Sequence, residues 1–111
     1  MSMEEKLGSV ELVVNRDAKK GGDVDIESLF SYGEQRKEFE LFGDVKRWRT
    51  KIKAVISKIG ILETSADITK KRGEKTCIRG LFSYPARKDS FAASEDIKKG
   101  DTISVDIELV G

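Results

Sequence analysis

The chain has 111 residues, of which 37% are charged and 38% apolar, and its formal net charge is +1. These values favour a soluble globular protein over a disordered chain, and they exclude a global positive field that would draw the whole molecule to nucleic acid or to a membrane. No apolar run approaches the roughly 20 residues that a membrane-spanning helix needs.

A four-residue string, LFSY, occurs at residues 29–32 and again 52 positions later, at 81–84. Aligning residues 8–47 with 60–99 without a gap gives 12 identities in 40 columns. Unrelated segments of this composition would share roughly 2 or 3 identities, and similarity at a fixed period is typical of repeat architecture. The sequence therefore predicts an internal duplication.

The period divides the chain into a tail over residues 1–7 and two repeats, 8–59 and 60–111. We expect one domain, because a single repeat would bury too little surface to fold alone. Each repeat fits four short strands separated by polar, glycine-containing turns. In the first repeat the predicted strands cover residues 9–14, 24–32, 39–41 and 50–58. In the second repeat they cover residues 61–66, 76–84, 91–93 and 102–110.

The second predicted strand gives LFSY a structural role. At a spacing of two residues, Ile26, Phe30 and Tyr32 share one face of the strand, and the second repeat places the same residue types at the same spacing. LFSY would then supply an aromatic pair to the shared core, once in each repeat. Pro85 follows the second LFSY, where a strand should end.

The opposite face of this strand changes charge between the repeats. The first repeat has Asp23, Asp25 and Glu27, and the second has Lys75, Cys77 and Arg79. The inversion could serve self-recognition between chains or a salt-bridged contact between strands. Three alternating carboxylates could also bind a hard cation, but a solvated strand face is the commoner reason for such a pattern and the spacing is not that of an EF-hand. We therefore expect no metal site.

The fourth predicted strand of the first repeat is ambiguous, because residues 46–59 also follow helical spacing. In the second repeat every other residue from Ile103 to Leu109 is apolar, as in a half-buried strand. The apolar residues of the two segments alternate in step if the first repeat contains one inserted residue. Trp48 is the natural candidate for that insertion. We therefore predict a strand over 50–58.

Eight short strands with frequent turns indicate an all-β fold, either an antiparallel sandwich or a closed barrel. A pseudo-twofold axis would relate the two four-strand repeats. The seam between the repeats is a natural place for a groove.

Little in the sequence points to catalysis or to a cofactor. The chain has no histidine, the commonest general base and a common metal ligand. Its single cysteine, Cys77, is expected to be an inert thiol, and neither lysine–glycine turn has the spacing of a phosphate-binding loop. We therefore expect a protein that is not an enzyme and that has no cofactor.

The same composition suggests where the protein works. The chain start, MSMEEKLG, lacks the apolar stretch of a secretory signal, and a single cysteine fits a reducing compartment, so we expect a cytoplasmic protein. Asn15 is the only asparagine and Gln35 the only glutamine. Few amides with abundant lysine and glutamate are typical of hyperthermophile proteins, which predicts a thermophilic source.

Basic residues cluster in the middle of the chain, where residues 46–88 hold 13 basic and 3 acidic side chains. Five of these cations flank Trp48 in a predicted turn and the following strand: Lys46, Arg47, Arg49, Lys51 and Lys53. A flat ring beside cations suits base stacking and phosphate neutralisation, so these six residues are the candidate nucleic-acid site. The alternative is a ring that packs over one end of the core, with the cations merely solvated.

Two further turns are basic in both repeats, with Lys19 and Lys20 in the first and Lys71 and Arg72 in the second. They could assist binding or simply confer solubility. Three classes of function therefore remain. A DNA- or RNA-binding module is favoured, an interaction or homo-oligomeric assembly module that uses edge strands is the alternative, and a small-molecule binder or enzyme at the repeat seam is third.

Overall fold

The computed structural model describes residues 5–110, and this part of the chain contains eight strands and four short helices. In chain order they are β1 (Lys6–Val13), β2 (Asp23–Val24), α1 (Ile26–Leu29), α2 (Tyr32–Gln35), β3 (Phe39–Glu40), β4 (Lys51–Ile56), β5 (Gly60–Ser65), β6 (Lys75–Thr76), α3 (Ile78–Leu81), α4 (Tyr84–Lys88), β7 (Phe91–Ala92) and β8 (Thr102–Leu109). Strand is the main secondary structure, which is compatible with the predicted all-β class. None of the helices described is long and apolar enough to cross a membrane.

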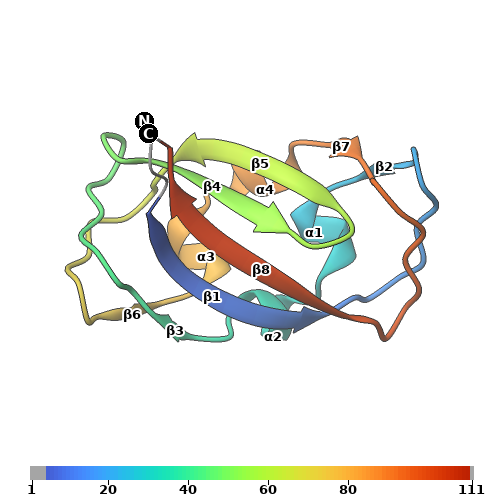
Figure 1. Ribbon diagram of the computed structural model, residues 1–111, viewed down its shortest axis with the longest axis horizontal. Helices are drawn as coiled ribbons and strands as arrows, with labels where there is room; N and C mark the ends of the chain where they lie inside the picture. The colour runs from blue at the N-terminus through green and yellow to red at the C-terminus, as the bar shows by residue number, and fades with distance from the viewer. Residues whose placement is uncertain (1–4, 111) are drawn as a thin grey trace.

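Four strands form one antiparallel sheet in the order β1-β8-β4-β5 (Figure 1). Apolar side chains on its inner face are buried in the core: Leu12, Ile52, Ala54, Ile56, Leu62, Ile103, Val105 and Ile107. Successive side chains of a strand point to opposite faces, so the alternating pattern decides which face of the sheet meets the core. The core is completed by the helices, which lie behind the sheet in Figure 1.

The other four strands form two short antiparallel ladders. β2 pairs with β7, and β3 pairs with β6. Figure 1 shows these ladders at opposite ends of the long axis. Each ladder joins a segment from the first predicted repeat to one from the second, so the two halves of the sequence interlock at both ends.

Residues 5–110 therefore do not show the expected closed barrel or a sandwich of two four-stranded sheets. The physical reason is that the second predicted strand of each repeat is mostly helical, which leaves too few strand residues for a second sheet. Within the four-stranded sheet, β1 and β5 form the two edges.

Three of the four predicted strands in each repeat are confirmed. They correspond to β1, β3 and β4 in the first repeat and to β5, β7 and β8 in the second. The ambiguous stretch 50–58 is a strand over Lys51–Ile56, and not a helix. β1 begins at Lys6, so Leu7, which we assigned to the tail, lies in this strand and is buried.

The second predicted strand is wrong in both repeats. After two strand residues the chain turns into α1 or α3. Asp25 caps α1, because its carboxylate accepts a hydrogen bond from the Ser28 N–H at 2.7 Å and so satisfies a free donor of the first turn. Ile26, Leu29 and Phe30 also fit spacings of three and four residues, which is why the hydrophobic pattern alone allowed both structures.

LFSY consequently has a different role from the one predicted. In both copies its leucine and phenylalanine are buried, and its serine caps the next helix, α2 or α4. Its tyrosine is exposed, 59% for Tyr32 and 57% for Tyr84, so only the phenylalanine of the expected aromatic pair enters the core. Pro85 lies in the first turn of α4, where proline costs no helical hydrogen bond, and not beyond a strand.

The charge inversion between the repeats forms a contact within the molecule. Glu27 of α1 accepts hydrogen bonds from Arg79 of α3 at 3.1 Å and from Nε of Arg87 of α4 at 2.6 Å. Arg79 also donates to the side-chain oxygen of Gln35 at 3.3 Å. Of the two roles predicted for the charge inversion, the structure shows the salt-bridged contact, although it joins helices and not strands. These side chains lie at the seam, where helices of the two predicted repeats meet.

A glycine–phenylalanine contact recurs at the 52-residue spacing. A Cβ atom on Gly8 would lie 2.6 Å from Cδ2 of Phe39, and one on Gly60 would lie 2.9 Å from Cδ2 of Phe91. Each ring therefore covers backbone that has no room for a side chain. This packing explains two of the identities between the repeats.

Candidate nucleic-acid interface

The candidate residues around Trp48 lie at one end of the molecule. Two segments, residues 41–51 and 66–75, run side by side at the left of Figure 1 and form what we term the basic end. An antiparallel bridge between Val45 and Lys70 holds the segments together. The loop that carries Trp48 is therefore fixed by pairing with a part of the chain about 20 residues away in sequence.

Trp48 projects from the basic end into solvent. Its relative exposure is 70%, and its backbone is left-handed, with a φ of 65°. The guanidinium carbon of Arg47 lies 4.4 Å from the ring centroid, within the range of a cation–π contact, and Nε of Arg47 lies 3.7 Å from a carboxylate oxygen of Asp67. The alternative in which this ring packs over the core is therefore wrong.

The opposite end of the molecule has glycine at the corresponding position. The Trp48 N–H donates to the carbonyl oxygen of Ala66 at 2.7 Å, and the Gly100 N–H donates to that of Val14 at 2.9 Å. Both backbones are left-handed, with φ of 65° and 96°. The two donors are 52 positions apart, and so are the two acceptors, so Trp48 occupies the place of Gly100.

The structure leaves Arg49 without a counterpart at the opposite end, and not Trp48 as predicted for the inserted residue. Thr50 Oγ1 accepts the Lys46 N–H at 2.8 Å, just as the Asp101 carboxylate accepts the N–H of the corresponding lysine at 2.9 Å. Thr50 thus corresponds to Asp101, which lies 51 positions later, whereas Trp48 corresponds to Gly100, which lies 52 positions later. The residue between Thr50 and Trp48 is the extra one, and it adds a cation to the turn.

Backbone preference does not explain a tryptophan at position 48. A left-handed conformation costs an L-residue roughly 1–2 kcal/mol, and glycine avoids that cost. Core packing does not offset it, because the ring is exposed. Residues held in unfavourable backbone conformations cluster at ligand sites, which makes Trp48 the leading candidate for a ligand contact.

The five cations predicted beside Trp48 are not equivalent in the structure. Lys46, Arg47, Arg49 and Lys51 are exposed at the basic end. Lys53 lies on the sheet, with its side chain 12% exposed and its amine 3.9 Å from a carboxylate oxygen of Glu108. Four of the five predicted cations are therefore presented to solvent together with the ring.

The second predicted set of basic turns is divided between the two ends. Lys71 and Arg72 lie in the second segment of the basic end. Lys19 and Lys20 lie at the opposite end, where the Lys20 N–H donates to Asp96 at 2.8 Å. The amino-acid sequence does not reveal this division, because it depends on which loops pair.

Three residues of the basic end were not assigned to the candidate site from the sequence. Lys70 and Lys75 belong to its second segment, and Phe42, which is 53% exposed, belongs to its first. Phe42 has no aromatic counterpart, since Ser94 stands 52 positions later. That difference was visible in the aligned repeats and could have identified Phe42.

The two ends differ in charge although their backbones correspond. The basic end, residues 41–51 and 66–75, carries eight basic and three acidic side chains. The corresponding residues, 93–102 and 14–23, carry five of each and form what we term the neutral end. The excess of positive charge is therefore confined to one end of the molecule.

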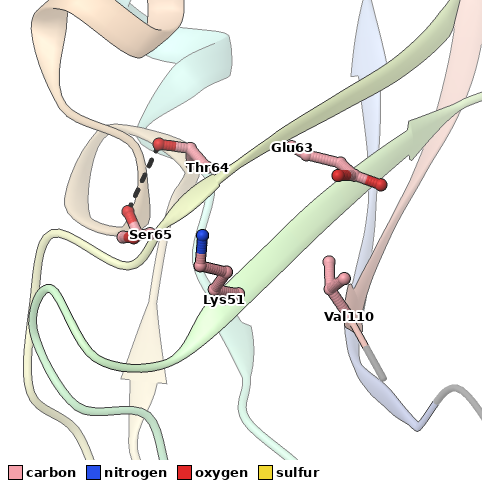
Figure 2. Close-up of a pocket in the computed structure, with 5 residues that line it drawn as sticks. All are labelled: Lys51, Glu63, Thr64, Ser65 and Val110. Atoms are coloured by element: carbon pink, nitrogen blue, oxygen red, sulfur yellow. Dashed lines mark hydrogen bonds between the residues drawn. The ribbon is translucent and has the colours of Figure 1, made fainter.

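An open depression of about 320 Å³ adjoins the basic end (Figure 2). Its lining comes from the start of β4, the end of β5 and the residue after β8: Lys51, Glu63, Thr64, Ser65 and Val110. Thr64 Oγ1 donates to the Ser65 carbonyl oxygen at 3.4 Å. An amine, a carboxylate and two hydroxyls make this lining suited to a polar group rather than an apolar ligand.

Comparison with protein-family models, with curated proteins and with solved structures gave no match to this chain. Function is therefore inferred from the geometry and charge of the chain itself. In the part of the chain described, no group of three or more Cys, Asp and Glu side chains is placed to hold a metal ion. Cys77 carries a free thiol at the N-cap position of α3.

Proposed function

We propose that this protein is a non-catalytic nucleic-acid-binding module whose ligand lies across the basic end. The contrast between the two ends carries the proposal. One end has eight basic against three acidic side chains and an exposed tryptophan, and the other has equal charges and a glycine in the tryptophan's place. If folding required the tryptophan and the basic side chains, both ends would carry them. Because only one end does, we attribute the difference to binding of a ligand.

The proposal includes the predicted duplication, with two repeats related by a pseudo-twofold axis. The order of the elements recurs about 52 residues later, and the glycine–phenylalanine contacts recur at the same spacing. Matching hydrogen bonds at the two ends add further support. Duplication would give both ends the same backbone, and later divergence would make one of them basic.

Phosphate contacts would dominate binding. Each lysine or arginine that neutralises a phosphate releases counterions, so log affinity falls with log salt by about 0.7 per contact on a single strand and about 0.9 on a duplex. The net charge of the chain is only +1, so this attraction acts at the basic end and not over the whole surface. The ligand would therefore have to lie against that end.

A matched pair of double variants tests the proposal by fluorescence anisotropy with a labelled oligonucleotide. Lys46→Ala with Lys71→Ala removes two exposed charges from the basic end. Lys98→Ala with Lys19→Ala removes the two structurally corresponding lysines from the neutral end. The first variant should bind more weakly at low salt and should have a salt slope smaller by about 1.4, which corresponds to two phosphate contacts.

The neutral-end variant should bind like the unmodified protein. Absence of low-salt binding by the unmodified protein would refute a nucleic-acid function. Equal losses in the two variants would refute the assignment to the basic end, because diffuse charge would then account for binding.

Self-association through β5 is a second candidate function, because the two sheet edges are protected differently. At β1, Glu34 accepts the Val13 N–H at 2.6 Å and pairs with Lys37 at 2.8 Å. The residue 52 positions after Glu34 is Ala86, which has no side-chain acceptor to protect β5 in the same way. An edge strand without such a cap is a template for pairing with a second chain.

Light scattering over a range of protein concentrations tests this second candidate. Ile61 lies on β5 and is 55% exposed, so Ile61→Lys places a charge on the edge without disturbing the core. If β5 pairs between chains, the unmodified protein should be a dimer that this variant dissociates. A monomer at high concentration would eliminate the second candidate.

A further inference from the structure

We infer that the ligand of the basic end is single-stranded nucleic acid, with two unpaired bases stacking on Trp48 and Phe42. This inference rests on the proposed function and names its ligand class. It adds Phe42 as a second stacking platform, which lies at the start of the same loop segment as Trp48.

The exposed aromatic residues of the chain fall into two kinds when the repeats are compared. Tyr32 and Tyr84 are exposed to nearly the same degree and stand 52 positions apart, so each repeat has one. Trp48 and Phe42 are exposed by 70% and 53%, and their counterparts are not aromatic. The two rings that distinguish the ends therefore both lie at the basic end.

The fold does not require either ring. The Phe42 N–H donates to the Leu7 carbonyl oxygen at 2.8 Å, and at the neutral end the Ser94 N–H donates to that of Ile59 at 3.0 Å. Serine thus supports the same backbone contact that phenylalanine does. Gly100 supports the backbone contact of Trp48 in the same way. Each ring is an addition to a loop that also forms without it.

The backbones of Phe42 and Trp48 are held at opposite sides of the basic end. Phe42 is bonded to the start of β1, one edge of the sheet, and Trp48 to the residue that follows β5, the other edge. The chain between them runs along the left end of the molecule in Figure 1 and carries Lys46 and Arg47, both exposed. A strand laid across this end would meet a ring near each side and cations between them, an arrangement typical of proteins that track a flexible backbone and stack its bases.

A duplex fits this end less well. Bases in a duplex are stacked on one another, so reading them requires a helix or a ribbon that enters a groove. The helices described have four or five residues, about 6–8 Å at 1.5 Å per residue, and α1 and α3 bury their isoleucine and leucine side chains in the core. A duplex could therefore meet only the cations of the basic end, whereas a single strand offers open base faces to both rings.

The experiment compares a labelled single strand of about 12 nucleotides with the duplex that it forms with its complement. The substitutions are Trp48→Gly and Phe42→Ser, which install the residue found at the neutral end. Each should weaken single-strand binding by roughly 5- to 150-fold, since stacking on one base corresponds to about 1–3 kcal/mol, and each should leave duplex binding unchanged. The unmodified protein should prefer the single strand, and the fluorescence of its only tryptophan should be quenched on binding.

Thermal unfolding of each variant controls for misfolding. Trp48→Gly should keep or raise the melting temperature, because glycine suits the left-handed backbone. Equal affinity for single strand and duplex, with both variants unaffected, would overturn the inference. The proposed function would survive that result if binding still depended on salt and on Lys46 and Lys71. No binding to either probe at low salt would overturn both.

Discussion

Trp48 and Gly100 share one backbone conformation and one hydrogen-bonding role, yet one carries the largest side chain and the other carries none. Where both residues satisfy the same local geometry, the choice between them is not made by the fold. The left-handed φ of 65° makes tryptophan the less favourable choice, and its exposure removes packing as compensation. Trp48 therefore indicates a function, because the requirements of the fold alone would favour glycine at this position.

Gly8 illustrates the opposite situation, in which packing dictates the residue. Its α-carbon lies against the ring of Phe39, and a Cβ atom would come within 2.6 Å of that ring. We expect Gly8→Ala to lower the free energy of unfolding by about 1–3 kcal/mol, because the buried ring must shift. Urea denaturation followed by circular dichroism measures the change.

Gly33 provides the control for that substitution. It lies in α2, and a Cβ atom there would meet nothing within 4 Å. Gly33→Ala should raise the free energy of unfolding by about 0.5–1 kcal/mol, because alanine favours the helix. Similar effects of the two substitutions would contradict the packing that we describe for Gly8.

At the scale of elements, short helices and an edge strand depend on single side chains. Glu34 lies in α2 and protects the edge of β1 through the Val13 N–H. The hydrogen bond from Lys37 and the one from Val13 lower the pKa of Glu34 below its ordinary value. Because both contacts are stronger with the charged form, this protection is sensitive to acid.

The sign of the pH effect follows from the lowered pKa. The contribution of Glu34 to stability is complete above the pKa of an unfolded glutamate, and it is lost as the pH falls through the lower folded value. Glu34→Gln should therefore reduce the free energy of unfolding at neutral pH. In acid, the free energies of unfolding of the variant and of the unmodified protein should lie closer together. Denaturant titrations across the acidic range measure this, and a difference that does not vary with pH would contradict it.

At the scale of the whole molecule, the partly buried contact around Glu27 ties the two halves of the sequence together. Arg87 is 6% exposed in its side chain and donates to Glu27 and to the Phe82 carbonyl oxygen. Glu27→Ala would leave this cation buried without its carboxylate. We expect a loss of about 3–5 kcal/mol in the free energy of unfolding, as for other broken buried ion pairs.

The exposed pair between Lys6 and Asp106, at 3.3 Å, is the control for that prediction. Both side chains are more than a third exposed, so Asp106→Ala should cost about 1 kcal/mol or less. If the two substitutions had equal effects, the seam would contribute no more to stability than an ordinary surface pair.

The prediction of the strands shows what local pattern can and cannot provide. The alternation in β4 and β8 predicted their faces, because a strand exposes every second residue to the same environment. Alternation gave the wrong structure for residues 24–32, where Asp25 and Ser31 cap helices whose apolar residues also fit a strand. Capping is decided by a hydrogen bond to the backbone, which hydrophobic periodicity does not register.

By itself, the sequence determined the 52-residue spacing between similar segments and three strands in each half, since the first follows from comparing the two halves and the second from simple alternation. Only the tertiary structure decided that the loop of Trp48 pairs with residues 66–75, that Lys71 joins it while Lys19 does not, and that the ring stays in solvent. The physical reason is that loop pairing is set by the strand order of the sheet and by the ladders at its ends. These are long-range contacts, and no local pattern encodes them.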